Sequence, residues 1–243
     1  MTNIVAVIPA RCGSKGVPHK NIKELCGKPI LAYSVAAGRK SKLIDRVIVS
    51  TDSKKYADLA EKYGAECPFL RPSSISRDTS TDYEFVKHLL DWLKSNEHFQ
   101  PEYLVLLRPV TPLRDPSTID SAIDIFINNV EATSLRSAHE MSETAYKKFE
   151  IDGDYLKAVG SNSFELDPLN EPRQNFPKTY NPNGYVDILK TSFILKHKKI
   201  NGDRVMPFIT PRSYEIDSIE DFELIEWIIQ KDITYYKKLF EEY

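Results

Sequence analysis

The sequence predicts an α/β fold with a mostly parallel sheet, and two observations support this prediction. Short β-branched apolar runs alternate along the chain with longer amphipathic segments, which is typical of this fold class. Three of the runs are almost continuously apolar, as expected of strands buried on both faces of a parallel sheet. They are residues 4–8, 46–50 and 103–107. The 243 residues suffice for one large domain, or for one large and one small domain.

Each expected helix has an apolar stripe or a local start or stop signal. Tyr83, Val86 and Leu93 recur at helical spacing, Pro29 precedes one segment, and Gly64 follows another. The expected helices are residues 30–38, 53–63, 79–93 and 117–128, and a final helix capped by Asp217 or Ser218. Further strand-like pieces are residues 185–189 and 205–209.

A polar segment, residues 133–179, interrupts the alternation of strands and helices. It contains Asp152-Gly-Asp154, a hairpin signal, and it is rich in Asn and Pro toward its end. We therefore expect a small β-containing subdomain at 133–179, inserted into an α/β domain formed by residues 1–132 and 180–243.

Charge and composition exclude several classes of protein. The 33 Lys and Arg residues nearly balance 35 Asp and Glu residues, giving a net charge of −2, which argues against a nucleic-acid-binding surface. No apolar run approaches the roughly 20 residues that span a bilayer, and no basic leader is evident. Three widely spaced cysteines without a CxxC pair argue against a disulfide framework or a zinc knuckle. We expect a cytoplasmic protein without nucleic-acid or membrane partners.

The loop after the first strand, residues 9–21, has the chemistry of a phosphate-binding loop. It places Arg11, Lys15 and Lys20 around two glycines and the hydroxyl of Ser14, although it lacks both GxGxxG and the Walker A pattern. A triphosphate carries about four negative charges, so three cations leave a remainder that Mg²⁺ would neutralise. The alternative is a solvated loop whose charges only aid solubility.

The run Ile8-Pro-Ala-Arg-Cys-Gly-Ser-Lys-Gly-Val-Pro-His-Lys-Asn-Ile22 resembles the opening motif of the CMP-sialic acid synthetases, the acylneuraminate cytidylyltransferases. The similarity continues in the family's order through residues 48–52, 70–72, 78–81, 109–114, 172–174, 182–184 and 215–217. It implies transfer of CMP from CTP to the anomeric hydroxyl of an acidic nine-carbon sugar, with release of pyrophosphate. It also implies a three-layer, Rossmann-like sheet of the nucleotide-diphospho-sugar transferase type and a homodimer joined through the insertion.

The resemblance also assigns residues to the two substrates and a metal. Arg11, Lys15 and Lys20 are the catalytic cations that would stabilise the departing pyrophosphate. The CTP-binding positions are Ala10, Arg11, Ser14, Lys15, Lys20, Asn21, Arg71 and Asp82. The sugar-binding positions are Arg108, Thr111, Arg173, Asn183, Gly184 and Asp187, and the metal ligands are Glu215 and Asp217.

Elementary chemistry makes two of these assignments reasonable and leaves an alternative for each. Glu215 and Asp217, separated by one position, would point to the same side of a strand and offer oxygen ligands to Mg²⁺. The alternative for this pair is a helix N-cap and a solvated charge. The planar guanidinium of Arg173 suits a sugar carboxylate. Its alternative is a salt bridge to Glu171 or another acid.

Three departures from the family's motifs bear on the sugar. Arg108 stands where glutamine is common, Asp82 stands where serine is common, and Asn183-Gly184 is followed by Tyr185-Val-Asp187 where an aromatic residue often follows. Because buried polar groups reject substrates that leave them unpaired, these changes favour bacterial diamino sugars such as legionaminic acid over N-acetylneuraminate. The pseudaminate and KDO classes remain alternatives, as does a non-catalytic nucleotide-binding module of the same fold. No general base is evident, so we expect direct in-line attack by the sugar hydroxyl.

Overall fold

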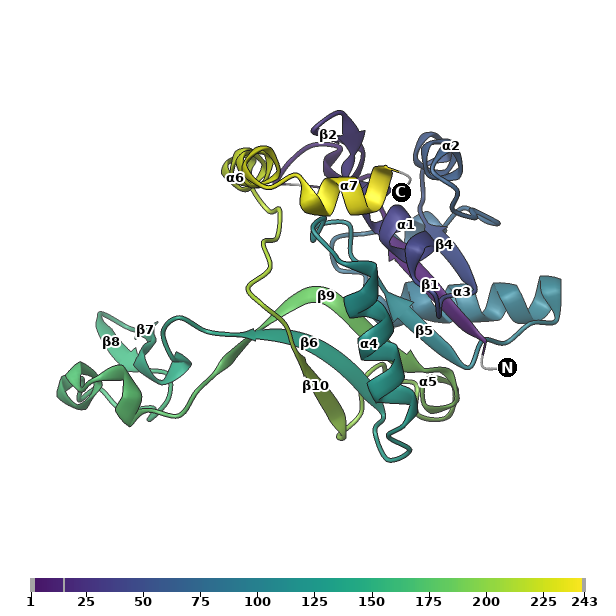
Figure 1. The fold of residues 1–243 in the computed structure, drawn as a ribbon. Helices are drawn as coiled ribbons and strands as arrows, with labels where there is room; N and C mark the ends of the chain where they lie inside the picture. Colours follow the sequence, from purple (N-terminus) through teal and green to yellow (C-terminus); the bar gives the residue numbers. More distant parts are fainter. Residues whose placement is uncertain (1–2, 15, 242–243) are drawn as a thin grey trace.

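The chain folds around a six-stranded sheet with the strand order β10-β6-β9-β5-β1-β4 (Figure 1). The computed structural model describes residues 3–14 and 16–241. The strands are β1 (Ile4–Pro9), β4 (Arg46–Ser50), β5 (Tyr103–Leu106), β6 (Ser134–Glu140), β9 (Tyr180–Lys190) and β10 (Val205–Ile209). Strands β4 and β5 run parallel to β1, and β10 runs parallel to β6. Only β9 runs against its neighbours β5 and β6, which confirms a mostly parallel sheet.

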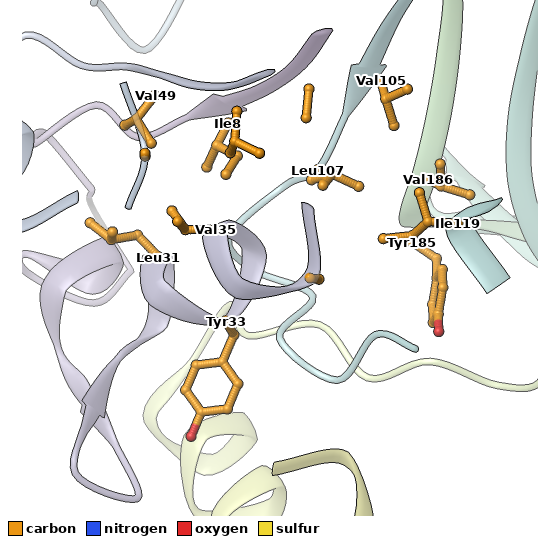
Figure 2. Packing of buried hydrophobic residues seen from close by; sticks show 14 of the residues in the cluster. Ile8, Leu31, Tyr33, Val35, Val49, Val105, Leu107, Ile119, Tyr185 and Val186 are labelled. Atoms are coloured by element: carbon orange, nitrogen blue, oxygen red, sulfur yellow. The ribbon is translucent and has the colours of Figure 1, made fainter. Parts of the chain in front are cut away.

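Two hydrophobic cores, one on each face of the sheet, create three layers. In β1, the side chains of Ile4, Ala6 and Ile8 join one core, whereas those of Val5 and Val7 join the other. Figure 2 shows part of the first core, where Ile8 lies near Leu31 and Val35, and Val105 lies near Leu107. This alternation of fully buried side chains confirms the expected burial of the strands on both faces.

Helices cover both faces of the sheet (Figure 1). Side chains of α1 (Ile30–Lys40), α2 (Lys54–Lys62), α4 (Pro116–Ile127), α6 (Ile219–Lys231) and α7 (Thr234–Phe240) join the first core. Side chains of α3 (Asp82–Glu97) and α5 (Thr191–His197) join the second. The sequence did not predict α5 and α7, because each has seven residues and buries too few of them to show a helical period.

Local capping determines where two of the helices begin. Helix α3 starts three residues later than expected, because Thr81 and Glu84 form a capping box. In α6, Ser218 and Asp221 form the same arrangement, so Ser218, and not Asp217, is the N-cap. Within the described residues, no helix has both the length and the apolar character needed to cross a membrane.

Residues 141–179, which we call the arm, extend away from the sheet between β6 and β9 (Figure 1). Strands β7 (Phe149–Asp152) and β8 (Tyr155–Ala158) pair in it as an antiparallel hairpin, at the expected turn. The insertion was expected to begin at residue 133, but residues 134–140 form β6 of the central sheet. The boundary moves because Leu135 is fully buried against the sheet's core. A second small hairpin pairs β2 (Glu24–Leu25) with β3 (Lys28–Pro29).

Candidate functional site

A polar cavity of about 410 Å³, the main cavity, lies at the carboxyl ends of β1 and β5. This is where open parallel sheets bind ligands. The loop after β1 contributes Pro9, Arg11, Ser14, Gly16, Lys20 and Asn21 to its wall. The other lining residues are Arg71, Arg77, Ser80, Thr81, Asp82, Phe85, Arg108, Pro109, Val110 and Asp217. Eight of the predicted site residues therefore meet in one cavity, and Lys15 lies outside the described residues.

The loop after β1 is joined to the segment that precedes α6. The Lys20 ammonium donates to the Ile216 carbonyl oxygen at 2.6 Å and to Asp217 Oδ1 at 3.1 Å. A β-carbon added at Gly16 would lie 2.6 Å from the Asp217 carbonyl oxygen, so only glycine fits this close approach. Residues nearly 200 positions apart thus form one wall of the cavity.

Four further contacts hold the backbone and the side chains at the start of this loop. The Asn21 amide donates to the Arg11 carbonyl oxygen at 2.9 Å, and the Arg11 guanidinium pairs with Asp78 at 2.6 Å. Asp52, at the end of β4, accepts from the Cys12 backbone N–H at 2.9 Å and from its thiol at 3.2 Å. Burial and the hydrogen bond to Asp52 raise the pKa of the Cys12 thiol, so the thiol stays protonated at neutral pH. Cys12 therefore serves here as a hydrogen-bond donor.

Arg71 is buried in the wall of the main cavity. Its guanidinium donates to the Ser50 hydroxyl at 3.1 Å and to the Ser50 carbonyl oxygen at 2.6 Å, and it lies 4.9 Å from the centre of the Phe85 ring. Burial lowers the pKa of Arg71 to about 10, so the side chain remains a cation at neutral pH.

Arg108 and Asp82 form a two-pronged ion pair at the edge of the main cavity. Their closest atoms, Nη2 and Oδ2, are 2.5 Å apart, and Asp187 Oδ2 lies 3.7 Å from the same nitrogen. Burial opposes the charge on Arg108, but the hydrogen bond and charge of Asp82 outweigh it and raise the pKa of Arg108. Arg108, Asp82 and Asp187 also line an adjoining cavity of about 230 Å³. Burial raises the pKa of Asp187, while Arg108 and Arg136 oppose that rise.

Glu215 and Asp217 lie in an extended loop, not in the strand that we expected for them. Ile216 between them is fully buried and donates its backbone N–H to the Val110 carbonyl oxygen at 2.8 Å. Burial, and then the charge of Asp217, raise the pKa of Glu215. The Asp217 side chain is 77% exposed, and Lys20 contacts it.

This donor set fits a magnesium ion that is shared with a phosphate ligand. Among the described residues, no group of three or more His, Cys, Asp or Glu side chains is arranged to hold a metal. Mg²⁺ in phosphate-transfer sites needs only one or two carboxylates, because the phosphates supply further oxygens. Asp217, which lines the main cavity, and Glu215, whose pKa it raises, would supply these carboxylates.

Several predicted residues lie outside the main cavity. Ala10 is buried in the first core, and Thr111 is buried where its hydroxyl donates to the Asn183 carbonyl oxygen at 3.3 Å. Gly184 has a positive φ of 54°, and a β-carbon there would lie 2.8 Å from Glu215 Oε1. The chain therefore packs Thr111, Asn183 and Gly184 together close to Glu215.

Arg173 lies on the arm, where it lines a separate cavity with residues of β6 and the arm. Its guanidinium donates to the Ser142 carbonyl oxygen. Glu171, its alternative partner, instead accepts from the Asn175 amide at 3.1 Å. The fold of one chain therefore does not bring Arg173 to the main cavity.

The sequence did not indicate several residues that line the main cavity or that hold the loop after β1 in place. Arg77, Ser80 and Phe85 line it, Asp78 pairs with Arg11, and Asp52 anchors the loop. Asp52, Asp78 and Ser80 fall inside motifs that carry the family resemblance, which is the signal that could have identified them.

Known proteins are similar to this chain over most of its length. The N-acylneuraminate cytidylyltransferase of Escherichia coli O18:K1:H7 is 34% identical over 232 residues, which are 95% of this chain and 53% of that enzyme. This chain thus spans about half the length of that relative. A CMP-N,N'-diacetyllegionaminic acid synthase of Legionella pneumophila is 31% identical over 230 residues, covering 93% of this chain and 96% of that one.

A solved structure and a family model cover nearly the whole chain. CMP:2-keto-3-deoxy-manno-octonic acid synthetase complexed with CTP has the same fold, with a TM-score of 0.70 at 13% identity, over 95% of this chain and 100% of that chain. The family model described as cytidylyltransferase matches residues 5–240. This match spans both the loop after β1 and the Glu215–Asp217 segment, so the chain belongs to the cytidylyltransferase family.

Proposed function

We propose that this protein transfers CMP from CTP to an acidic nonulosonic acid of the legionaminic or sialic type and releases pyrophosphate. The observation that carries the proposal is the convergence of Arg11, Lys20, Arg71 and Arg108 on one cavity at the carboxyl end of the sheet. Such a group of cations in a nearly neutral chain suits a polyanionic nucleotide and an acidic acceptor. The relatives from E. coli and Legionella, an N-acylneuraminate cytidylyltransferase and a CMP-N,N'-diacetyllegionaminic acid synthase, support the same substrates.

The reaction we propose is a direct in-line displacement. The anomeric oxygen of the sugar loses its proton and bonds to the α-phosphorus of CTP, while the bond to the β-phosphate oxygen breaks and pyrophosphate leaves. Arg11 and Lys20, together with Lys15, hold the β- and γ-phosphates and stabilise the charge that develops on the leaving group. A magnesium ion bound by Glu215 and Asp217 would supply further positive charge to the phosphates.

On the sugar side, Arg108 and Asp187 supply the polar contacts that favour a diamino sugar. Arg108 already pairs with Asp82, and Asp187 is only 6% exposed. A substrate that leaves such buried groups without hydrogen bonds binds poorly, so this pair would discriminate among acidic sugars. The sugar side of the site would rest on three packed residues next to Arg108 and Glu215, namely Asn183, Gly184 and Thr111.

We further propose that the protein acts as a homodimer in which the arm of one subunit reaches the site of its partner. Several of the arm's large apolar side chains are exposed, and a second subunit would cover them. They include Phe149 (48%), Ile151 (80%), Tyr155 (73%) and Phe164 (56%). In such a dimer Arg173 would approach the partner's sugar and pair with its carboxylate. A cytoplasmic setting agrees with the three free cysteines.

A substrate panel tests the proposed activity. We expect pyrophosphate release from CTP and Mg²⁺ with legionaminate, less with neuraminate and pseudaminate, and least with the eight-carbon acid KDO. Arg11→Ala should lose this activity while its circular dichroism stays unchanged. Single-turnover mixing should show no covalent CMP-enzyme intermediate.

Other outcomes of the panel would contradict specific parts of the proposal. CTP binding without pyrophosphate release from any sugar would indicate a nucleotide-binding module without catalysis. A clear preference for neuraminate would overturn the choice of legionaminate. A trapped CMP-enzyme adduct would exclude direct attack.

A further inference from the structure

Arg114 is a fully buried cation between the two segments that carry the sugar-side residues. It is 0% exposed, and its guanidinium donates to five oxygen atoms. They are the carbonyl oxygens of Tyr185 (2.6 Å), Arg108 (2.6 Å), Gly184 (2.8 Å) and Thr111, and the Ser34 hydroxyl (2.8 Å). The oxygens thus come from the segment after β5, from β9 and from α1.

A buried charge of this kind is costly unless its surroundings compensate for it. Within the described residues Arg114 forms no salt bridge and its five acceptors are neutral oxygens, while the more distant charges of Asp187 and Glu215 also favour its charged form. Burial lowers the pKa of Arg114 to about 9, which still leaves the guanidinium protonated at neutral pH. Because five hydrogen bonds offset the desolvation, the position strongly favours the planar donor set of arginine.

The sheet itself explains what these hydrogen bonds do. Strands β5 and β9 pair in antiparallel register from Tyr103 with Lys190 to Leu106 with Asp187, and the pairing ends there. Arg108 and Tyr185 lie just beyond the last pair, where the two backbones separate. The Arg114 guanidinium donates to both of their carbonyl oxygens. It thus connects the two backbones beyond the point where the hydrogen bonds between β5 and β9 end.

We infer that Arg114 is a positioning residue: it fixes the distance between the segment that carries Arg108 and the segment that carries Gly184 and Asp187. The inference rests on the proposed function, since these segments form the sugar side of the site. The phosphate side has its own anchors, because Asn21 and Asp78 hold Arg11 and Ser50 holds Arg71. Loss of Arg114 should therefore disturb the sugar much more than CTP.

The substitution Arg114→Lys tests this role, because an ammonium group keeps the charge but cannot reach five oxygens in a plane. We expect the KM for the acidic sugar to rise about tenfold or more and the KM for CTP to change less than about threefold. The backbone amides of Arg108, Val110 and Thr111 and of residues 184–187 should exchange hydrogen faster, whereas those of residues 19–22 should not.

Two further variants keep the test decisive. Ser34→Ala removes one of the five acceptors, and with it the hydroxyl's own hydrogen bond to the Arg108 carbonyl oxygen at 3.3 Å, so it should raise the KM for the sugar about two- to fivefold. Arg46→Lys is the matched control, because Arg46 is held by Glu66 and Glu97 at the start of β4, away from the cavity. This control should lower thermal stability with both KM values unchanged.

The outcomes separate the inference from the proposed function. If Arg114→Lys and Ser34→Ala leave the KM for the sugar unchanged, or if Arg114→Lys only reduces the amount of active enzyme, Arg114 stabilises the fold and the inference is wrong. If the wild type releases no pyrophosphate but the amide exchange changes as expected, the proposed function fails and the positioning role stands.

Discussion

At the scale of single residues, close contacts hold the groups of the main cavity before any ligand binds. Arg11, Arg71 and Arg108 each have a fixed partner, which limits the conformations available to these long side chains. Such preorganisation reduces the entropy that binding must overcome. The backbone of the loop after β1 is equally constrained, because Gly16 lies against the Asp217 carbonyl group.

Replacing Gly16 with alanine should weaken CTP binding. The new β-carbon would lie 2.6 Å from the Asp217 carbonyl oxygen, which forces the loop and the segment before α6 apart. We expect the dissociation constant for CTP, measured by calorimetry, to rise about tenfold or more.

Gly13→Ala in the same loop is the matched control for Gly16→Ala. Its β-carbon would lie 3.8 Å from Arg11 Nη1, an ordinary contact, so CTP affinity should change little. Equal effects of the two substitutions would show that loop flexibility, and not the contact with Asp217, controls binding.

At the scale of elements, contacts of one carboxylate, that of Asp115, hold the C-terminal helix α7 against the start of α4. Asp115 is the N-cap of α4, where it accepts from the Ser117 backbone N–H at 3.0 Å, and it also pairs with Lys238 of α7. Burial opposes ionisation of Asp115, but the hydrogen bonds to Lys238 and Ser117 prevail and lower its pKa. One carboxylate therefore supports two helices.

The stabilising effect of this ion pair should depend on pH. Because the pKa of Asp115 is lower in the folded protein than its ordinary value of 3.8, its contribution is complete above that value. It is lost as the pH falls through the lower, folded-state pKa. Asp115→Asn keeps an N-cap side chain but removes the charge, so it should cost roughly 0.5–1 kcal/mol at pH 7.

Thermal unfolding of the wild type and Asp115→Asn across pH checks this expectation. The difference in stability should be present at pH 7 and disappear in strong acid. A difference that stays constant down to pH 2 would mean that the amide is simply a poorer cap and that the ion pair contributes nothing. Lys238→Gln should reproduce the pH-dependent part of the difference in stability, because it leaves Asp115 in place as the N-cap of α4.

At the scale of the whole molecule, the arm separates Arg173 from the other predicted sugar-binding residues of its own chain. The sheet domain contains Arg108 and Asp187, whereas Arg173 sits beyond β6 on the protruding segment (Figure 1). A symmetric dimer in which arms cross would reunite them, since each subunit would complete the site of the other.

Mixing two inactive variants tests this arrangement. If Arg173 acts on the partner's site, Arg11→Ala and Arg173→Ala subunits combine into dimers with one intact site. About half of the dimers are mixed and each has one of two sites intact, so about one quarter of wild-type activity should return. Pyrophosphate release after co-refolding is the measurement.

Three results would contradict this shared site. They are no recovery of activity, an active Arg173→Ala protein, or a monomer in light scattering at assay concentration. Ile151→Asp on the exposed hairpin serves as a control, since it should prevent both dimerisation and recovery.

Much of the fold was predictable from local pattern. The continuous apolar runs of β1, β4 and β5 identified buried parallel strands, because a strand covered on both faces has no polar side. Strand β6 was missed, since its polar residues, among them Ser134 and Ser137, are buried only by neighbours that are distant in sequence. Helices α5 and α7 were missed because two turns are too short to show a period.

The sequence by itself determined the family and the cationic character of the loop after β1, because these follow from the order and type of residues in contiguous motifs. Only the tertiary structure decided which of those residues meet. It joined Lys20 to Asp217 and left Arg173 outside the cavity. It also gave Arg114 five acceptors at the point where two strands part. Distances between residues remote in sequence depend on strand order and loop path, which no local motif encodes.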